Sequence, residues 1–220
     1  MEALQQQFFN LEIMRAAWPM LVDGLVMTLL ICAIVIPLGL LSGIAAALLS
    51  LSHRRSVRWP AVAYVDFFRA LPPLVLLIFV FSGLPFAGIR PSPLEAVAIA
   101  FLLNNSAYYG EIYRAGIQSI GAGQREAARS TGLSSAQTMV YVVLPQAVRN
   151  VLPDLISNTV EVVKLTSLAS VVSLAELLYQ ADMARSVTFN ASPIVAAALI
   201  YLVILWPFVR LVSRMERRLA

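Results

Sequence analysis

The sequence predicts an all-α membrane protein with five transmembrane helices. Of its 220 residues, 60% are hydrophobic and only 13% are charged, and residues 24–52 include no charged side chain. That composition is far from the composition of a soluble domain. About 20 apolar residues already cross a bilayer as a helix, and the backbone of a lipid-exposed span must satisfy its own hydrogen bonds. We therefore expect one transmembrane domain over residues 1–220, without a separate soluble domain.

The five predicted spans follow in order along the chain. The first contains Pro37, at which we expect a kink that a packed membrane helix tolerates. The second begins amphipathic and is interrupted early by Pro72 and Pro73. The first twenty residues lack the basic start of a signal peptide, so we expect the first span to be retained. The predicted spans are 24–52, about 59–84, about 94–120, about 151–178, and 193–212.

Polar side chains mark the third and fourth predicted spans. In the third span, Asn104, Tyr108 and Glu111 recur at helical spacing and form one stripe. In the fourth span, Glu161 and Lys164, the only lysine of the chain, belong to a second stripe. Ionisable side chains inside a membrane are costly and usually functional, so these stripes should face protein or water. The alternative is that Glu161 and Lys164 pair with each other or with a second chain.

The arginines predict the orientation of the chain in the membrane. Basic loops stay in the cytoplasm, so the N-terminus should lie outside and the C-terminus inside. Residues 121–150 then form a cytoplasmic loop, and their periodic apolar positions predict helices. Three arginines fall on the outer side, Arg15, Arg90 and Arg185. Eleven fall on the inner side: Arg54, Arg55, Arg58, Arg114, Arg125, Arg129, Arg149, Arg210, Arg214, Arg217 and Arg218.

The composition excludes several classes of function. Cys32 and His53 are the only cysteine and histidine, so the sequence predicts neither a disulfide nor a metal site. The only lysine follows Val163, which rules out a glycine-rich phosphate-binding loop. The basic residues do not form a stripe with exposed aromatics, so nucleic acid is not an expected partner. We predict no catalytic residue and no cofactor bound by this chain.

A motif in the 121–150 loop resembles a known family. The loop reads GQREAARSTG from Gly123 to Gly132 and continues to Leu144 and Pro145. This order and spacing resemble the EAA loop of the permease subunits of type I ABC importers. The resemblance implies that the loop binds an ATPase subunit through Glu126, Ala127, Ala128, Arg129, Gly132, Leu144 and Pro145.

A joint that transmits force needs a short helix with a fixed end. We expect a helix from Glu126 whose carboxylate lies near the positive helix start, with Arg129 as an i+3 partner. Gly132 permits a left-handed turn or close approach of the partner. Pro145 should limit the next helix and direct the chain back to the membrane.

Three further segments resemble the polar amino acid branch of this family, which includes histidine, glutamine and arginine permeases. They are 67–72, 106–120 and 164–168, with departures from the family pattern at Ala70, Leu71 and Leu165. The two polar stripes, if they face each other, would hold the ammonium and carboxylate of an amino acid. The predicted substrate pathway comprises Asn104, Tyr108, Glu111, Asn158, Glu161, Lys164, Thr166 and Ser167.

The resemblance also implies partners and a location. The chain would be a non-catalytic, multi-pass subunit in the lipid of a bacterial inner membrane, while two copies of a separate ATPase bind ATP and Mg²⁺. A second permease chain, identical or paralogous, would complete the pathway, and an external solute-binding protein would dock on loops 84–93 and 180–192. The alternatives are an ion-coupled secondary transporter and a non-transporting membrane scaffold.

Overall fold

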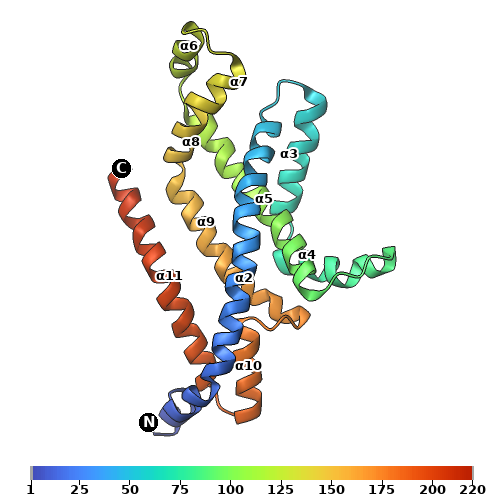
Figure 1. Cartoon of the computed structure of the whole chain (residues 1–220), viewed down its shortest axis with the longest axis vertical. Coiled ribbons are helices and arrows are strands. Elements are labelled where there is room, and N and C mark those ends of the chain that lie inside the picture. The colour runs from blue at the N-terminus through green and yellow to red at the C-terminus, as the bar shows by residue number, and fades with distance from the viewer. Residues whose placement is uncertain (1, 220) are drawn as a thin grey trace.

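The computed structural model describes residues 2–219, and within them every regular element is a helix. Two long helices lie at the centre of the molecule: α2 (Leu11–Ser50) and α5 (Pro93–Ser119), which cross and pack against each other (Figure 1). At 1.5 Å per residue, α2 is roughly 60 Å long, twice the thickness of the hydrocarbon core. The all-α prediction is therefore confirmed over the described residues.

The other elements surround these two helices. The elements before α5 are α1 (Glu2–Phe8), α3 (Arg55–Ala70), α4 (Pro73–Ile78), the π-helix η1 (Phe79–Gly83) and the 3₁₀-helix η2 (Leu84–Ala87). The elements after α5 are α6 (Ala122–Ser130), α7 (Ser135–Thr138), the π-helix η3 (Met139–Val143), α8 (Leu144–Asn150), α9 (Leu152–Leu165), the 3₁₀-helix η4 (Thr166–Val172), α10 (Leu177–Thr188) and α11 (Ser192–Leu219).

Fewer than five segments have the length and apolar composition of a membrane span. Three helical segments of the described chain qualify, Glu2–Ser50, Leu152–Val172 and Ser192–Arg217. A fourth is added if α3 and the segment from α4 to η2 count as one bent span. The helix predicted over 94–120 exists as α5, but its polar side chains keep it below the hydropathy of a typical span.

The first helix begins earlier than predicted. The sequence places its start at residue 24, whereas α2 starts at Leu11. Asn10 caps that start, because its side-chain oxygen accepts hydrogen bonds from the backbone N–H groups of Glu12 and Ile13. The helix then continues through Pro37 without interruption.

The second predicted span is not one straight helix. α3 and the segment that follows it meet at an angle of 102°. Pro72 and Pro73 cause this break, because proline lacks a backbone donor and disfavours helical geometry in the residue before it. The segment from α4 to η2 projects sideways from the helical body as an arm (Figure 1).

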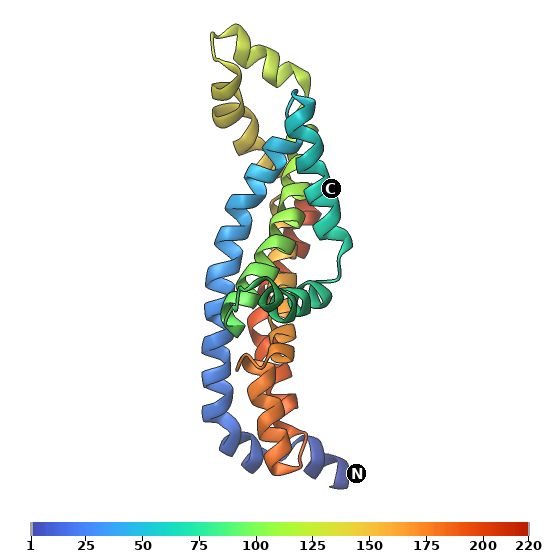
Figure 2. The same ribbon diagram turned by 90° about the vertical axis from the view of Figure 1, so that its right-hand side faces the viewer.

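The prediction for 151–178 is wrong at its C-terminal end. The helical path ends at Val172, and Ser173 adopts a left-handed conformation with φ of 58°. A separate helix, α10, then starts after Glu176, whose carboxylate accepts hydrogen bonds from the N–H groups of Leu178 and Tyr179. α10 spans Leu177–Thr188, so most of the predicted outer loop 180–192 is helical. This helix lies beside the first half of α2 (Figure 2).

Small residues allow α2 and α5 to approach closely. The buried ring of Tyr109 on α5 lies against Gly39 of α2, and a Cβ added at Gly39 would lie 3.2 Å from this ring. A Cβ added at Gly43 would lie only 2.6 Å from the Cβ of Tyr109. The Tyr109 hydroxyl, in turn, shares a 2.8 Å hydrogen bond with the Thr159 hydroxyl, which ties α9 to α5.

We predict that Gly43→Ala lowers the free energy of unfolding by about 1–3 kcal/mol, because the added methyl group overpacks the contact with Tyr109. Thermal unfolding in detergent measures this loss. Gly121→Ala is the matched control, since an added Cβ there meets no atom within 4 Å. Equal stability of the two variants would contradict the close contact.

Candidate functional site

A polar cavity of about 420 Å³ lies between α5 and α9, next to the first residue of α4. Its walls combine amide, hydroxyl, acidic and basic side chains with a few apolar ones. The cavity brings together most of the predicted pathway residues, namely Asn104, Tyr108, Asn158, Glu161, Lys164 and Ser167. Pro73, Asn105, Leu165 and Leu168 complete the lining.

The break between α3 and α4 positions two of these side chains. The last carbonyl groups of a helix have no partner inside the helix. Asn104 donates from Nδ2 to the carbonyl oxygen of Phe68 at 3.0 Å, and the Tyr108 hydroxyl donates to the carbonyl oxygen of Arg69 at 3.3 Å. Both carbonyls belong to the last turn of α3, so α5 satisfies the groups that the break leaves free.

Glu161 and Lys164 form an ion pair on the same helix. They are three residues apart on α9, and the Lys164 ammonium donates to Oε1 of Glu161. The side chains are 50% exposed for Lys164 and 66% exposed for Glu161. This pair is one of the alternatives that the sequence leaves open, but a pair within one helix does not hold two helices together.

Asn158 supplies a free donor in the cavity wall. Its Nδ2 atom is buried and has no hydrogen-bond partner among the described residues. A buried polar group without a partner costs free energy, so this donor favours a ligand with an acceptor oxygen. Asn158 lies one helical turn from Glu161 on the same wall.

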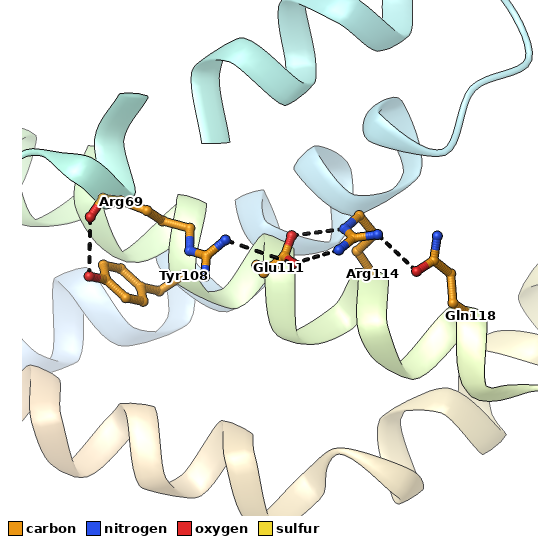
Figure 3. A network of polar contacts seen from close by, with 5 residues as sticks. All are labelled: Arg69, Tyr108, Glu111, Arg114 and Gln118. Atoms are coloured by element: carbon orange, nitrogen blue, oxygen red, sulfur yellow. Dashed lines mark hydrogen bonds and ion pairs between the residues drawn. The ribbon is translucent and has the colours of Figure 1, made fainter. Parts of the chain in front are cut away.

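Two of the predicted pathway residues, Glu111 and Thr166, are not among the residues that line this cavity. The Glu111 carboxylate accepts hydrogen bonds of 2.6 and 2.8 Å from Arg114 and lies 3.7 Å from a guanidinium nitrogen of Arg69 (Figure 3). Seven residues after Asn104 correspond to about 10 Å along the helix, which places Glu111 beyond the end of the cavity. Thr166 is buried and donates to the carbonyl oxygen of Val163.

The geometry of the 121–150 loop agrees with the sequence at Gly132 and differs at Glu126. Gly132 has φ of 88°, so it adopts the left-handed turn, one of the two alternatives that the sequence leaves open for this glycine. Glu126 is the fifth residue of α6 and therefore not at its positive start. Arg129 donates to the Ser135 hydroxyl and makes no ion pair with Glu126 in the described chain. Of the adjacent alanines, Ala127 is exposed and Ala128 is buried.

Pro145 does not interrupt the helical path. The segment from Ser135 to Asn150 stays helical because the π-helix η3 precedes α8. In a regular α-helix the ring of Pro145 would clash with the carbonyl group of Tyr141, and a wider turn relieves such a clash. Leu144 and Pro145 therefore begin α8, which leads the chain into α9.

The structure also adds residues to the cavity lining that were not predicted for the substrate pathway, among them Asn105 and Pro73. Asn105 lines the cavity beside Asn104 and is anchored by a 2.8 Å hydrogen bond to the carbonyl oxygen of Phe101. Pro73 reaches the cavity because of the 102° bend. The sequence does contain a signal for Asn105, because two adjacent asparagines are unusual in an apolar helix. It contains none for Pro73, because a proline pair predicts a break in a helix but not the angle of the break.

Comparison with known proteins places this architecture in a family. A family described as "Binding-protein-dependent transport system inner membrane component" matches residues 35–220. The chain belongs to this family. It is 36% identical over 211 residues to the probable glutamine ABC transporter permease protein GlnM of Bacillus subtilis (strain 168), an alignment that covers 96% of this chain and 98% of GlnM. It is also 36% identical over 211 residues to the glutamate/aspartate import permease protein GltK of Escherichia coli O157:H7, covering 92% and 94%.

A solved structure shows the same architecture. The crystal structure of an amino acid ABC transporter with histidines contains a chain that is 37% identical, with a TM-score of 0.84 and coverage of 93% of this chain and 96% of that chain. The MetNI methionine ABC transporter in an inward-facing conformation gives a TM-score of 0.76 at 18% identity. That second likeness shows a shared fold.

We predict that Glu161→Gln changes the free energy of unfolding by less than about 1 kcal/mol, because the ion pair is exposed and lies within one helix. The Asp182–Arg185 pair on α10 has the same spacing and similar exposure, so Asp182→Asn is the matched control. Thermal unfolding of both variants is the measurement. A loss above about 2 kcal/mol for Glu161→Gln alone would indicate a structural pair.

Proposed function

We propose that the chain is the non-catalytic permease subunit of an ABC importer in a bacterial inner membrane, and that a polar amino acid passes through the cavity between α5 and α9. The observation that carries this proposal is an exposed Glu161–Lys164 pair beside an unpartnered Asn158 donor in a membrane helix. The relatives named for glutamine and for glutamate or aspartate transport support the substrate class.

The cavity chemistry suits a zwitterion. Lys164 can bind the carboxylate of an amino acid, and the Asn158 amide can donate a second hydrogen bond to it. Glu161 can bind the ammonium group. Glu161 and Lys164 neutralise each other when the cavity is empty. When a zwitterion binds, each of them forms an ion pair with the ligand instead, and the net charge inside the membrane does not change. The cavity, at about 420 Å³, lies within the usual range for small-molecule sites.

The membrane topology follows from the same proposal. The five spans are α2, the bent pair of α3 with the arm, α5, α9 with η4, and α11. α1 and the last turns of α11 lie toward opposite ends of the long axis, which supports an odd number of crossings (Figure 1). In this topology α6 and α7 lie in the cytoplasm and α10 lies near the outer face, which the arginine distribution supports.

Other chains complete the transporter. A separate ATPase, present in two copies, binds ATP and Mg²⁺, because this chain has no glycine-rich phosphate-binding loop with a lysine. This ATPase contacts α6 and Gly132. A second permease chain, identical or paralogous, covers the arm, on which Phe79 and Phe86 are exposed. A solute-binding protein delivers the amino acid to the outer face, where η2 to α5 and α10 are the candidate docking elements.

The most direct test uses the complex of this chain with its ATPase in proteoliposomes. We expect one polar amino acid, presented by the solute-binding protein, to stimulate ATP hydrolysis and to accumulate in the vesicles. Uptake driven by an ion gradient without ATP would favour a secondary transporter. The absence of uptake with every amino acid would favour a scaffold.

We predict that Lys164→Met reduces amino acid uptake at least tenfold while the complex still assembles, because the carboxylate loses its cationic partner. Uptake and co-purification of the ATPase are the two measurements. Arg214→Met removes an exposed cation from α11, outside the cavity and outside the candidate docking elements, and should transport normally. Normal uptake by the Lys164 variant would show that the pathway lies elsewhere.

We predict that Gly132→Val impairs ATPase binding or transport but not membrane insertion. An added Cβ at Gly132 meets no atom within 4 Å, so the cost is the left-handed backbone, about 1–2 kcal/mol for an L-residue. Gly132→Asn should be milder, because asparagine tolerates this conformation.

Gly88 provides the matched control for the Gly132→Val variant. Its φ is 84°, and an added Cβ there also meets no atom within 4 Å, but it directly follows the arm, at the C-terminal end of η2, and lies outside the 121–150 loop. Gly88→Val should therefore retain ATPase binding in the same co-purification experiment. If both valine variants bind the ATPase equally well, the joint does not depend on the Gly132 turn.

A further inference from the structure

A second polar cavity lies among α2, α3 and α5. Its volume is about 410 Å³, and it shares no lining residue with the cavity between α5 and α9. Ser50 is the last residue of α2, and Gln118 is the penultimate residue of α5, so this cavity lies at the same end of the chain as α6. The lining residues are Ser50, Leu51, Arg58, Val62, Val65, Asp66, Glu111, Arg114 and Gln118.

The α5 wall of this cavity is internally paired. Arg114 donates to both carboxylate oxygens of Glu111 and, at 2.8 Å, to the side-chain oxygen of Gln118 (Figure 3). Arg69 approaches the same carboxylate from the last turn of α3. These side chains satisfy one another, so they form a wall that does not need a ligand.

Three polar groups of the cavity have no such partner. Within the described residues, the side chains of Arg58 and Asp66 make no ion pair or hydrogen bond. The Ser50 hydroxyl is buried without a hydrogen-bond partner, in a residue that is only 6% exposed. Buried polar groups in native proteins are normally paired, so the orphaned hydroxyl is an independent indication of a missing partner.

The free groups define the class of ligand. They are one cation, one anion and one hydroxyl, which complement a carboxylate, an ammonium group and an additional polar atom. The charged residues of the lining are Arg58, Arg114, Asp66 and Glu111, so their formal charges cancel. Arg69, which lies 3.7 Å from the Glu111 carboxylate but outside the lining, adds one positive charge beside this wall. Among the described residues, the charged groups of the lining without a partner are one cation, Arg58, and one anion, Asp66, and this pair favours a zwitterion over a simple anion.

We infer that this cavity is a second binding site for a free amino acid, reached from the cytoplasmic side. Arg58 binds its carboxylate, Asp66 binds its ammonium group, and Ser50 hydrogen-bonds the ligand. The inference rests on the proposed function for the topology and for the choice of an amino acid among zwitterions. The site is distinct from the transport pathway, because it lies between α3 and α5 and does not include α9.

The test is equilibrium binding of radiolabelled L-glutamine, L-arginine and L-histidine to the complex of this chain with its ATPase in lipid nanodiscs, without the solute-binding protein. We expect two saturable sites per permease chain for at least one of these probes. Lys164→Met should leave one site. Adding Arg58→Gln or Asp66→Asn to this variant should weaken the remaining site about tenfold or more.

Two further variants separate binding from packing. Arg55→Gln removes the same charge from the first residue of α3, which does not line the cavity, and should leave both sites unchanged. Ser50→Ala should weaken the second site severalfold without lowering the unfolding temperature, because the hydroxyl has no partner to lose. Equal weakening by Arg55→Gln, or unchanged binding in Ser50→Ala together with Arg58→Gln, would overturn the inference.

The outcomes distinguish this inference from the proposed function. A single site that Lys164→Met abolishes and Arg58→Gln leaves intact would overturn the second site alone. A site lost in Arg58→Gln but unaffected by Lys164→Met would contradict the pathway instead. If Arg58→Gln and Asp66→Asn change only the phosphatidylethanolamine that co-purifies with the complex, the cavity holds a lipid headgroup and the inference is overturned.

Discussion

The close contact between α2 and α5 is the constraint on which the rest of the structure depends. Tyr109 occupies the space that glycines at 39 and 43 leave open, and its hydroxyl reaches Thr159 on α9. One face of α5 is therefore fixed against α2 around Tyr109. The polar side chains on its other faces must then point toward α3 and α9, and that geometry creates both polar cavities.

The proline break after α3 is the second constraint on the structure. It interrupts a potential membrane span and leaves carbonyl groups in the last turn of α3 without a hydrogen-bond partner inside the helix. Asn104 and Tyr108 satisfy two of these carbonyls, so the same side chains hold the bend and line the cavity. Their conformation is thus set before any ligand arrives, which reduces the entropy lost on binding. Arg69 at the end of α3 extends this link to Glu111 and the second cavity.

Helical periodicity and charge predicted most of the cavity, since Asn104, Asn158 and Lys164 lie where their spacing placed them. Spacing gives the face of a helix but not the length of its contact with a neighbouring helix, so it could not show that Glu111 lines a different cavity from Asn104. The end of the fourth span was not readable, because it depends on the left-handed conformation of Ser173, and serine is not a residue that marks such a turn in a sequence as glycine does. The 102° angle after α3 likewise depends on packing beyond the proline pair.

The central claim is that α5 and α9 enclose a hydrated, amino-acid-binding pathway, and cysteine accessibility tests it most directly. Cys32, the only cysteine, is first replaced by serine to give a background for labelling. In the assembled transporter, Tyr108→Cys and Leu168→Cys, at cavity positions that carry neither charge of the ion pair, should react with a charged thiol reagent, and the transported amino acid should protect both. Leu199→Cys on α11, half exposed in this chain but facing an apolar groove, should not react. Labelling of Leu199→Cys alone, or a lack of protection at both cavity positions, would contradict the account.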